Sequence, residues 1–233
     1  SSDLAPGVKF ETAKFSWIGR VSSSINVTAM WNTSKIKTID DAFKMESALG
    51  ATGTGSTVYV YPNVLNRVVG TKFKLVMGYG GSNEAMLAME RGEVEGTSKP
   101  WAGLKLENAD WLRDKKLQIL VQYGRERSVE LPEVPTLTEL ATNDLDRRAF
   151  RFLTASPTIG RSFFAPPGVP KERVEILRRA FKELLSDDEF LRDAKTQSAE
   201  LGPLEGAVLQ SLVDEAFSHS PEVVKRAKEA SGL

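Results

Sequence analysis

Two short turns in the sequence combine glycines with hydroxyl side chains, and neither contains a nucleophile paired with a base. The first is ATGTGST, residues 51–57, and the second is GYGGSNE, residues 78–84. Glycine lets an anion approach the backbone closely, and Ser and Thr hydroxyls can donate hydrogen bonds. Each turn is expected between a strand and a helix, where backbone N–H groups and the helix dipole favour negative charge. The pattern favours a seat for a carboxylate or a phosphate.

Other roles for these turns stay open from residue types alone, because glycine-threonine turns are also ordinary strand-to-helix connectors. The first turn lacks the glycine-lysine-threonine ending of a phosphate loop and does not fit the dinucleotide fingerprint, and no Gly-x-Ser-x-Gly elbow occurs. Glu84 is expected to interact with a helix dipole, and no second carboxylate is positioned to form an acid–base pair with Glu93 or Glu95. We expect binding without chemistry; the alternative is an α/β enzyme for a phosphorylated or acyl substrate.

Composition excludes several classes of function. The 233 residues carry 31 Lys and Arg against 31 Asp and Glu, and a chain without net charge is a poor candidate for binding nucleic acid. Cysteine is absent and His219 is the single histidine, so neither a metal site nor a cofactor is expected. No apolar run approaches the roughly 20 residues that span a bilayer. The chain opens on SSDLAPGVKFE without a signal peptide, although an export signal could have preceded it.

The elements that must position the first turn follow from periodicity and capping residues. Residues 15–31 predict a strand, and Thr38 is expected to cap a short helix. After Ser56 the sequence has strand propensity, yet its later apolar residues repeat at helical spacing. We expect a helix here that is irregular or kinked at Pro62 and ends at Gly70.

A strand–turn–helix unit surrounds the second turn. Phe73–Met77 predicts a strand, Ser82 is expected to cap a helix that ends at Gly92, and Val94 lies in a further short strand. The stretch KLQILVQYG predicts another buried strand. Such alternation is typical of a parallel sheet, and ligands bind at the carboxyl ends of its strands.

The last third is predicted to be mostly helical. It follows a strand in RSFFAPPGVP, which three prolines end. Apolar residues at helical spacing run through 174–184 and 208–217, and Ser220 with Pro221 is expected to start a further helix.

Three longer stretches carry a family resemblance: GTKFKLVMGYGGSNEAMLAMERGEVEG, KLQILVQYGRERSVELPEVPTLTELA and RSFFAPPGVPKERVEILRRAFKELLSDDEFLRDA. Together they resemble the solute-binding proteins of tripartite tricarboxylate transporters, also called the Bug family, over nearly the whole chain. The resemblance implies an α/β, periplasmic-binding-protein-like fold of the Venus-flytrap type, whose two lobes close on a small carboxylate. It also implies a periplasmic protein that is not an enzyme and that docks on a membrane permease.

The resemblance also implies contact residues for the ligand. In the first turn these are Thr52, Gly53, Thr54, Gly55, Ser56 and Thr57. In the second turn they are Tyr79, Gly80, Gly81, Ser82 and Asn83. The loop after the next strand maps to Thr97 and Ser98. Arg125 and Arg127 follow a strand end and are weaker candidates, with surface exposure as the default.

The same resemblance predicts how the chain divides. The second, ligand-binding lobe is expected over residues 21–160, whereas residues 1–20 and 161–233 would form the remainder of the first lobe. The family begins with a strand and a glycine-rich turn that nothing in this sequence matches, so we expect one complete lobe and an incomplete first lobe. Its apolar helical stripes would then be covered in another way, and self-association is the expectation.

Overall fold

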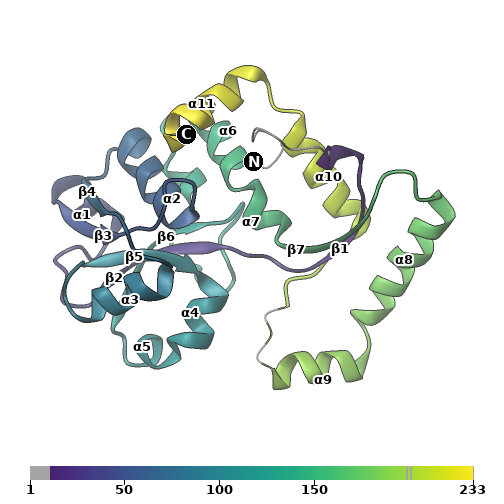
Figure 1. The fold of residues 1–233 in the computed structure, drawn as a ribbon, viewed down its shortest axis with the longest axis horizontal. Coiled ribbons are helices and arrows are strands. Elements are labelled where there is room, and N and C mark those ends of the chain that lie inside the picture. The colour runs from purple at the N-terminus through teal and green to yellow at the C-terminus, as the bar shows by residue number, and fades with distance from the viewer. Residues whose placement is uncertain (1–10, 198, 200, 233) are drawn as a thin grey trace. The chain divides into compact units, whose positions relative to one another are not determined.

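The computed structural model describes residues 11–197, 199 and 201–232 (Figure 1). The chain forms two compact units. Unit 1 contains the described residues up to Ser24 together with Ala155–His219, and unit 2 contains Ile25–Thr154 together with the described residues from Ser220 on. The α/β fold is as predicted.

Unit 2 is built on a five-stranded sheet in the order β4-β3-β5-β2-β6. Its strands are β2 (Asn26–Trp31), β3 (Ser47–Gly50), β4 (Phe73–Val76), β5 (Gly96–Pro100) and β6 (Leu117–Tyr123). Strand β3 pairs in parallel with β4 and β5, whereas β2 pairs antiparallel with β5 and β6. The carboxyl ends of β3, β4, β5 and β6 therefore meet at one edge of a mixed sheet, and the expectation of a purely parallel sheet was wrong for β2.

Helices cover both faces of this sheet (Figure 1). One face carries α1 (Ile39–Lys44), α2 (Thr57–Val64) with its π-helical continuation η3 (Leu65–Val69), α6 (Asp144–Leu153) and α11 (Pro221–Ser231). The other carries α3 (Ser82–Glu90), α4 (Trp101–Glu107) and α5 (Ala109–Arg113), and the short helix η4 (Leu137–Leu140) follows β6. A hydrophobic cluster fills the space on each side, so the sheet is buried on both faces.

Local signals explain where several of these helices begin and end. Thr38 caps α1, as the sequence predicts, and it does so in a capping box with Asp41. Pro62 lies inside α2, the helix loosens into a π-turn from Leu65, and Gly70 ends it with a φ of 94°. The predicted irregular helix that ends at Gly70 is confirmed.

Other boundaries differ from the predictions. Gly81, not Ser82, is the residue that precedes α3, and its backbone is extended. Strand β5 begins at Gly96 rather than around Val94. Strand β2 passes close to Gly96, since a Cβ there would lie 2.5 Å from the carbonyl oxygen of Ala29.

The single strand expected over residues 15–31 is two strands in different sheets. Strand β1 (Ser16–Ser22) belongs to unit 1, and β2 starts at Asn26 in unit 2. The backbone N–H of Ser24 between them donates to the carbonyl of Pro157. Ser24 is thus bonded within unit 1, and it is the last residue of the first segment of that unit.

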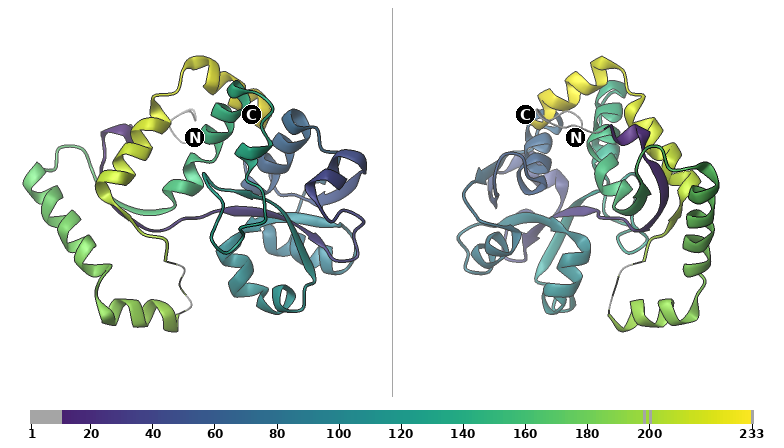
Figure 2. Two further views of the ribbon diagram at one scale, coloured as in Figure 1. Left: turned by 180° about the vertical axis from the view of Figure 1, so that it is seen from behind. Right: turned by 45° about the vertical axis from the view of Figure 1, so that its right-hand side comes forward.

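Unit 1 holds a three-stranded antiparallel sheet in the order β7-β1-β8. Strand β7 (Arg161–Ala165) confirms the strand predicted in RSFFAPPGVP, and β8 is Leu204–Glu205. The helices are η2 (Thr12–Lys14), α7 (Ala155–Ile159), α8 (Lys171–Leu184), α9 (Asp188–Thr196) and α10 (Gly206–Phe217). Figure 2 shows α8 continuing into α9 at a sharp angle in both of its views. Gly19 lets β1 lie against the ring of Phe181 from α8, since a Cβ would fall 2.2 Å from that ring.

Many large apolar side chains of unit 1 are exposed. Phe163 and Phe164 on β7 are 58% and 51% exposed, and Ile176 on α8 is 54% exposed. Leu177 and Leu184 on α8 and Val208 and Phe217 on α10 are exposed as well, so the predicted apolar stripes lie only partly in a core.

The last helix joins unit 2, whereas the sequence predicted it in the first lobe. Helix α11 buries Val223, Ala227 and Ala230, and Arg226 Nε donates to Asp146 Oδ1 of α6 at 2.5 Å. Figures 1 and 2 show α11, in yellow, beside α6. Its small apolar face and its ion pair both need α6, so the predicted boundaries 1–20, 21–160 and 161–233 do not match the division of the contacts here. Within the described residues, no helix has the length and apolar character needed to cross a membrane.

Candidate functional site

The first turn leaves β3 at Gly50 and enters α2 at Thr57. Its central residues, Gly53, Thr54 and Gly55, are exposed. No heavy atom lies within 4 Å of where a Cβ would stand at Gly53 or Gly55. The backbone of the turn is therefore open to a ligand from outside, and the start of α2 adds N–H groups that have no partner within the helix.

A pair of hydroxyls stands under this open backbone. Thr52 Oγ1 and Ser56 Oγ share a hydrogen bond, and Thr52 is buried while Ser56 is half-buried. Ser56 is the residue that precedes α2, but its side chain makes no capping bond to the helix. Its hydroxyl is thus oriented by Thr52 instead of by the helix, which leaves capacity for a bond to a ligand.

Asn26 joins this group although the sequence did not single it out. Thr57 Oγ1 donates to Asn26 Oδ1 at 3.4 Å, and Asn26 is buried at the start of β2. Because β2 is antiparallel to its neighbours, its first residue lies at the same edge as the carboxyl ends of the other strands. Only the pairing direction of β2, which local sequence does not reveal, would have identified it.

The second turn leaves β4 and enters α3, and it already contains a carboxylate of its own chain. Glu84 Oε2 accepts the backbone N–H of Gly80 at 2.7 Å. A Cβ at Gly80 would lie 3.0 Å from the same carboxylate. Glu84 therefore binds the turn directly, beyond the general interaction with a helix dipole that the sequence predicts. Tyr79 covers Gly50 at the end of β3, where a Cβ would stand 3.2 Å from its ring.

A buried lysine holds the start of α3. The side chain of Lys99 is 4% exposed, and Nζ donates to Asn83 Oδ1 at 2.8 Å, to Glu107 Oε2 at 2.8 Å and to Asn108 Oδ1 at 3.0 Å. The hydrogen bond from Lys99 lowers the pKa of the Glu107 carboxyl. Lys99 thus links Asn83, a predicted ligand contact, to Glu107 of α4. Sequence reasoning missed Lys99, whose only signal was a cation inside a strand.

Thr97 and Ser98 are fully buried, so the structure does not bring these predicted contact residues to the surface. Thr97 Oγ1 donates to the carbonyl of Gly50 at 2.8 Å, and Ser98 Oγ shares a hydrogen bond with Thr28 Oγ1 at 2.7 Å. Strand β5 lies between β3 and β2, so helices cover both of its faces. These two hydroxyls therefore stabilise the sheet beneath the first turn and are not free to contact a ligand at its surface.

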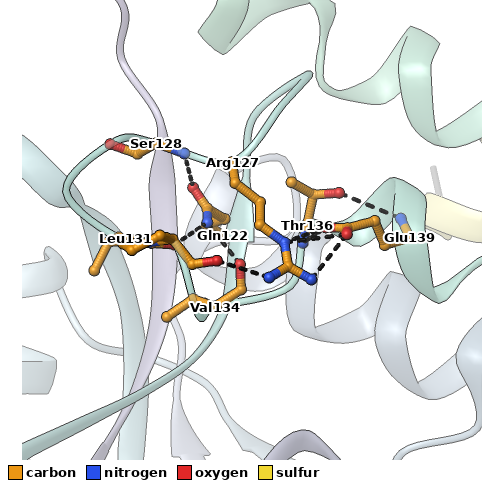
Figure 3. A network of polar contacts seen from close by, with 8 residues as sticks. Gln122, Arg127, Ser128, Leu131, Val134, Thr136 and Glu139 are labelled. Carbon is orange, nitrogen blue, oxygen red and sulfur yellow. Dashed lines mark hydrogen bonds and ion pairs between the residues drawn. The ribbon is translucent and has the colours of Figure 1, made fainter.

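The long loop after β6 ends at the same edge, and a buried glutamine gives it a fixed shape (Figure 3). Gln122 Nε2 donates to the carbonyls of Leu131 and Val134 at 2.9 and 2.7 Å, and its Oε1 accepts the N–H of Ser128 at 2.7 Å. Arg127, a weaker candidate for the ligand, is paired with Glu139 at 2.9 Å.

Glu139 closes this loop network. The hydrogen bond from Arg127 and the backbone N–H of Thr136 lower the pKa of Glu139 to about 2. Its charge therefore persists at neutral pH. Arg125 is exposed at the start of the loop. The described residues contain no group of three or more side chains suited to hold a metal ion.

Comparisons with known proteins fit this arrangement. A family model described as "Tripartite tricarboxylate transporter family receptor" matches residues 11–226. A curated protein of Cupriavidus necator, called "UPF0065 protein in gbd 5'region", is 27% identical over 136 residues, which is 58% of this chain. The aligned region spans only 36% of that curated relative. The family is one of transporter receptors, and the alternative of an enzyme finds no support among these proteins.

Solved structures share the fold. A TctC solute-binding protein from Polaromonas, solved without ligand, has a TM-score of 0.67 at 18% identity and covers 94% of this chain and 72% of its own. MatC from Rhodopseudomonas palustris, solved with bound malate, has a TM-score of 0.55 at 20% identity, with 98% and 74% covered. Another R. palustris protein, solved with adipate, has a TM-score of 0.59 at 18% identity, with 97% and 72% covered.

Proposed function

The chain belongs to the tripartite tricarboxylate transporter family of receptors, and we propose that it is a solute-binding protein that captures a small organic acid without changing it. The observation that carries this proposal is the first turn, whose open backbone and hydroxyl pair meet the start of α2. A carboxylate fits such a seat because helix N–H groups and hydroxyls are donors for its oxygens.

We assign direct contact with the carboxylate first to residues 52–57. Thr54 and Thr57 are exposed, and the Ser56 hydroxyl is oriented by its bond to Thr52. In the second turn, Tyr79, Gly80, Gly81 and Ser82 form the adjacent wall. Asn83, Thr97 and Ser98 take supporting roles, since their side chains are engaged within unit 2.

The ligand class is supported by two structural neighbours, which were solved with malate and with adipate. Both are small carboxylates. A site made of neutral donors suits a transport receptor, because the bound acid must be released again. The partner would be the membrane permease of a tripartite tricarboxylate transporter, and the protein would work in the periplasm.

A second association concerns unit 1. Its exposed apolar side chains, among them Phe163, Phe164 and Ile176, are candidates for self-association of the 233-residue chain. Light scattering over a range of protein concentrations tests this. A monomer at every concentration would contradict it.

The experiment for the binding function is a ligand panel read by thermal unfolding and calorimetry. Malate, adipate and citrate are compared with AMP, and a ligand at a hundredfold excess over its Kd should stabilise the fold by about 2.7 kcal/mol. We expect stabilisation by at least one carboxylate, no effect of AMP, and an unchanged ligand after incubation. Stabilisation by AMP alone, or turnover of the acid, would contradict the proposal.

A further inference from the structure

A cavity of about 430 Å³ lies in unit 2 at the edge of the sheet opposite to the two turns. It is formed where β2 ends and where β3 and β5 begin, around Trp31, Glu46 and Glu95. Because β5 has five residues, its length sets roughly 16 Å between this edge and the carboxylate site. The volume falls in the range of small-molecule sites. The cavity is therefore separate from the proposed carboxylate site.

One carboxylate of this cavity is held through one oxygen, and its second oxygen receives no donor from the described residues. The hydroxyl of Ser34, a buried residue, donates to Glu95 Oε2 at 2.7 Å and accepts the N–H of Ile36 at 3.1 Å. Glu95 is half-buried, and no described residue donates to its Oε1. A carboxylate held in this way presents its second oxygen to a cationic donor at little entropic cost.

One ammonium in the lining also lacks an ion-pair partner in the described part of the chain. Lys35 is exposed and forms no ion pair with either carboxylate of the cavity. Glu46, the other carboxylate, is engaged by Lys74 at 2.6 Å at the exposed rim. The cavity thus combines one uncompensated negative group, Glu95, with one uncompensated positive group, Lys35.

Apolar walls lie in the same cavity. Trp31, Ile36, Met45, Met89 and Val94 contribute to its lining. The indole of Trp31 is held edge-on against the ring of Trp111, at 4.8 Å and 82°. Methionines adapt to ligands of varied shape. A ligand would need an apolar body to fill this part of the cavity.

We propose that the cavity binds a zwitterion with an apolar body, which is the chemistry of a free α-amino acid with a hydrocarbon side chain. Its ammonium donates to Glu95, its carboxylate pairs with Lys35, and its side chain lies against Trp31 and the methionines. A plain organic cation would face Lys35 uncompensated, and a plain acid would face Glu95 uncompensated. A ligand with both charges satisfies both groups.

Matched ligands test this charge pattern on the 233-residue chain. Calorimetric titration with L-leucine is compared with 4-methylpentanoate, which lacks the ammonium, and with isopentylamine, which lacks the carboxylate. We expect leucine to bind and each analogue to bind at least about tenfold more weakly, since each loses a charge-assisted hydrogen bond. Absence of leucine binding up to about 10 mM, or equal binding of either analogue, would overturn the proposal.

Matched variants locate the site. Glu95→Gln keeps an acceptor for Ser34 but removes the charge, and it should weaken leucine at least about tenfold. Glu93→Gln is the control, because Glu93 is an exposed neighbour outside the lining and should leave leucine binding unchanged. Lys35→Gln, at an exposed position, replaces this test if Glu95→Gln fails to fold, and it should also weaken leucine binding, because the partner of the leucine carboxylate is lost. Equal affinity in the wild type and in these cavity variants, or displacement of leucine by malate, would show that leucine binds elsewhere.

Discussion

The two glycine turns of unit 2 have similar sequences, but they differ in what already occupies them. Both link a strand to a helix, and in both a side chain four residues on reaches back into the turn. In the first turn that side chain is Ser56, a neutral hydroxyl bonded to Thr52. In the second it is Glu84, a carboxylate that accepts the N–H of Gly80. The first helix start is open to an anion from outside, whereas the second already interacts with an anion of its own chain.

This difference teaches how to tell an anion seat from a connector. Glycine content and hydroxyl content are similar in the two turns, so they do not decide. The side chain that reaches back over four residues decides, because a carboxylate there, as at Glu84, takes the donors that a ligand would need. The support also differs: Asn26 reaches the first turn through Thr57, and Lys99 reaches the second through Asn83.

The largest expected effect comes from giving the first turn the carboxylate that the second already has. Ser56→Asp should lower affinity for the stabilising acid at least about 100-fold, because a fixed negative charge repels the ligand and takes its donors. Folding should be kept, since Asp is favoured before a helix. Calorimetry measures the affinity. Ser82→Asp is the comparison in the second turn and should cost clearly less than Ser56→Asp, because Ser82 lies in the adjacent wall and not at the helix start assigned to the carboxylate; equal losses would mean that the turns are equivalent.

The next effect concerns the support of the second turn. Lys99→Met should lower the free energy of unfolding by about 2 kcal/mol, because Asn83, Glu107 and Asn108 lose a shared buried donor. Glu107 is 45% exposed and can regain water, which limits the loss. Urea unfolding measures it. Lys105→Met, on the neighbouring helix, serves as a half-exposed control. An unchanged unfolding free energy in Lys99→Met would show that the cluster contributes nothing.

A smaller effect separates binding from folding at Ser56. Ser56→Ala should weaken the acid about tenfold, since one hydrogen bond to a charged group is lost. The melting temperature should fall only modestly, because the Ser56 side chain makes no capping bond and the only hydrogen bond lost within the fold is the one to Thr52. Calorimetry and thermal unfolding on the same variant separate the two. A lower melting temperature with unchanged affinity would assign Ser56 to folding alone.

The smallest expected effect tests whether the charge of Glu84 in the second turn changes the affinity for the ligand. Glu84→Gln keeps an acceptor for Gly80 and removes one negative charge near the site. Affinity for the acid should rise by less than about threefold at low salt, and the gain should vanish at high salt. A large gain would mean that the second turn becomes a seat once its own carboxylate is neutral.

Much of the fold was predictable because its signals are local. Thr38 and its capping box, Pro62 with Gly70, and the Ser220-Pro221 helix start all follow from neighbouring residues. The direction of β2 and the unit that receives α11 were not predictable in this way. Both depend on partners distant in sequence, such as Asp146 for Arg226.

The candidate site divides in the same manner. The exposed backbone of the first turn agrees with what residue types suggest, since glycine and hydroxyl patterns are local. The buried state of Thr97 and Ser98 follows from the central place of β5 in the sheet. The roles of Asn26 and Lys99 depend on strand pairing and on a helix that follows later, so no local pattern announces them.

The stacked phenols of Tyr61 and Tyr123 make the packing of α2 on β6 visible to spectroscopy. Their ring centroids are 4.1 Å apart and nearly parallel, and burial raises the pKa of both hydroxyls. Two chromophores this close couple electronically, so they should give a near-ultraviolet circular dichroism band that Tyr61→Phe removes. In an alkaline titration these two buried phenols should ionise only when the chain unfolds. The rate at which phenolate absorbance appears at alkaline pH would then report the rate at which this core opens.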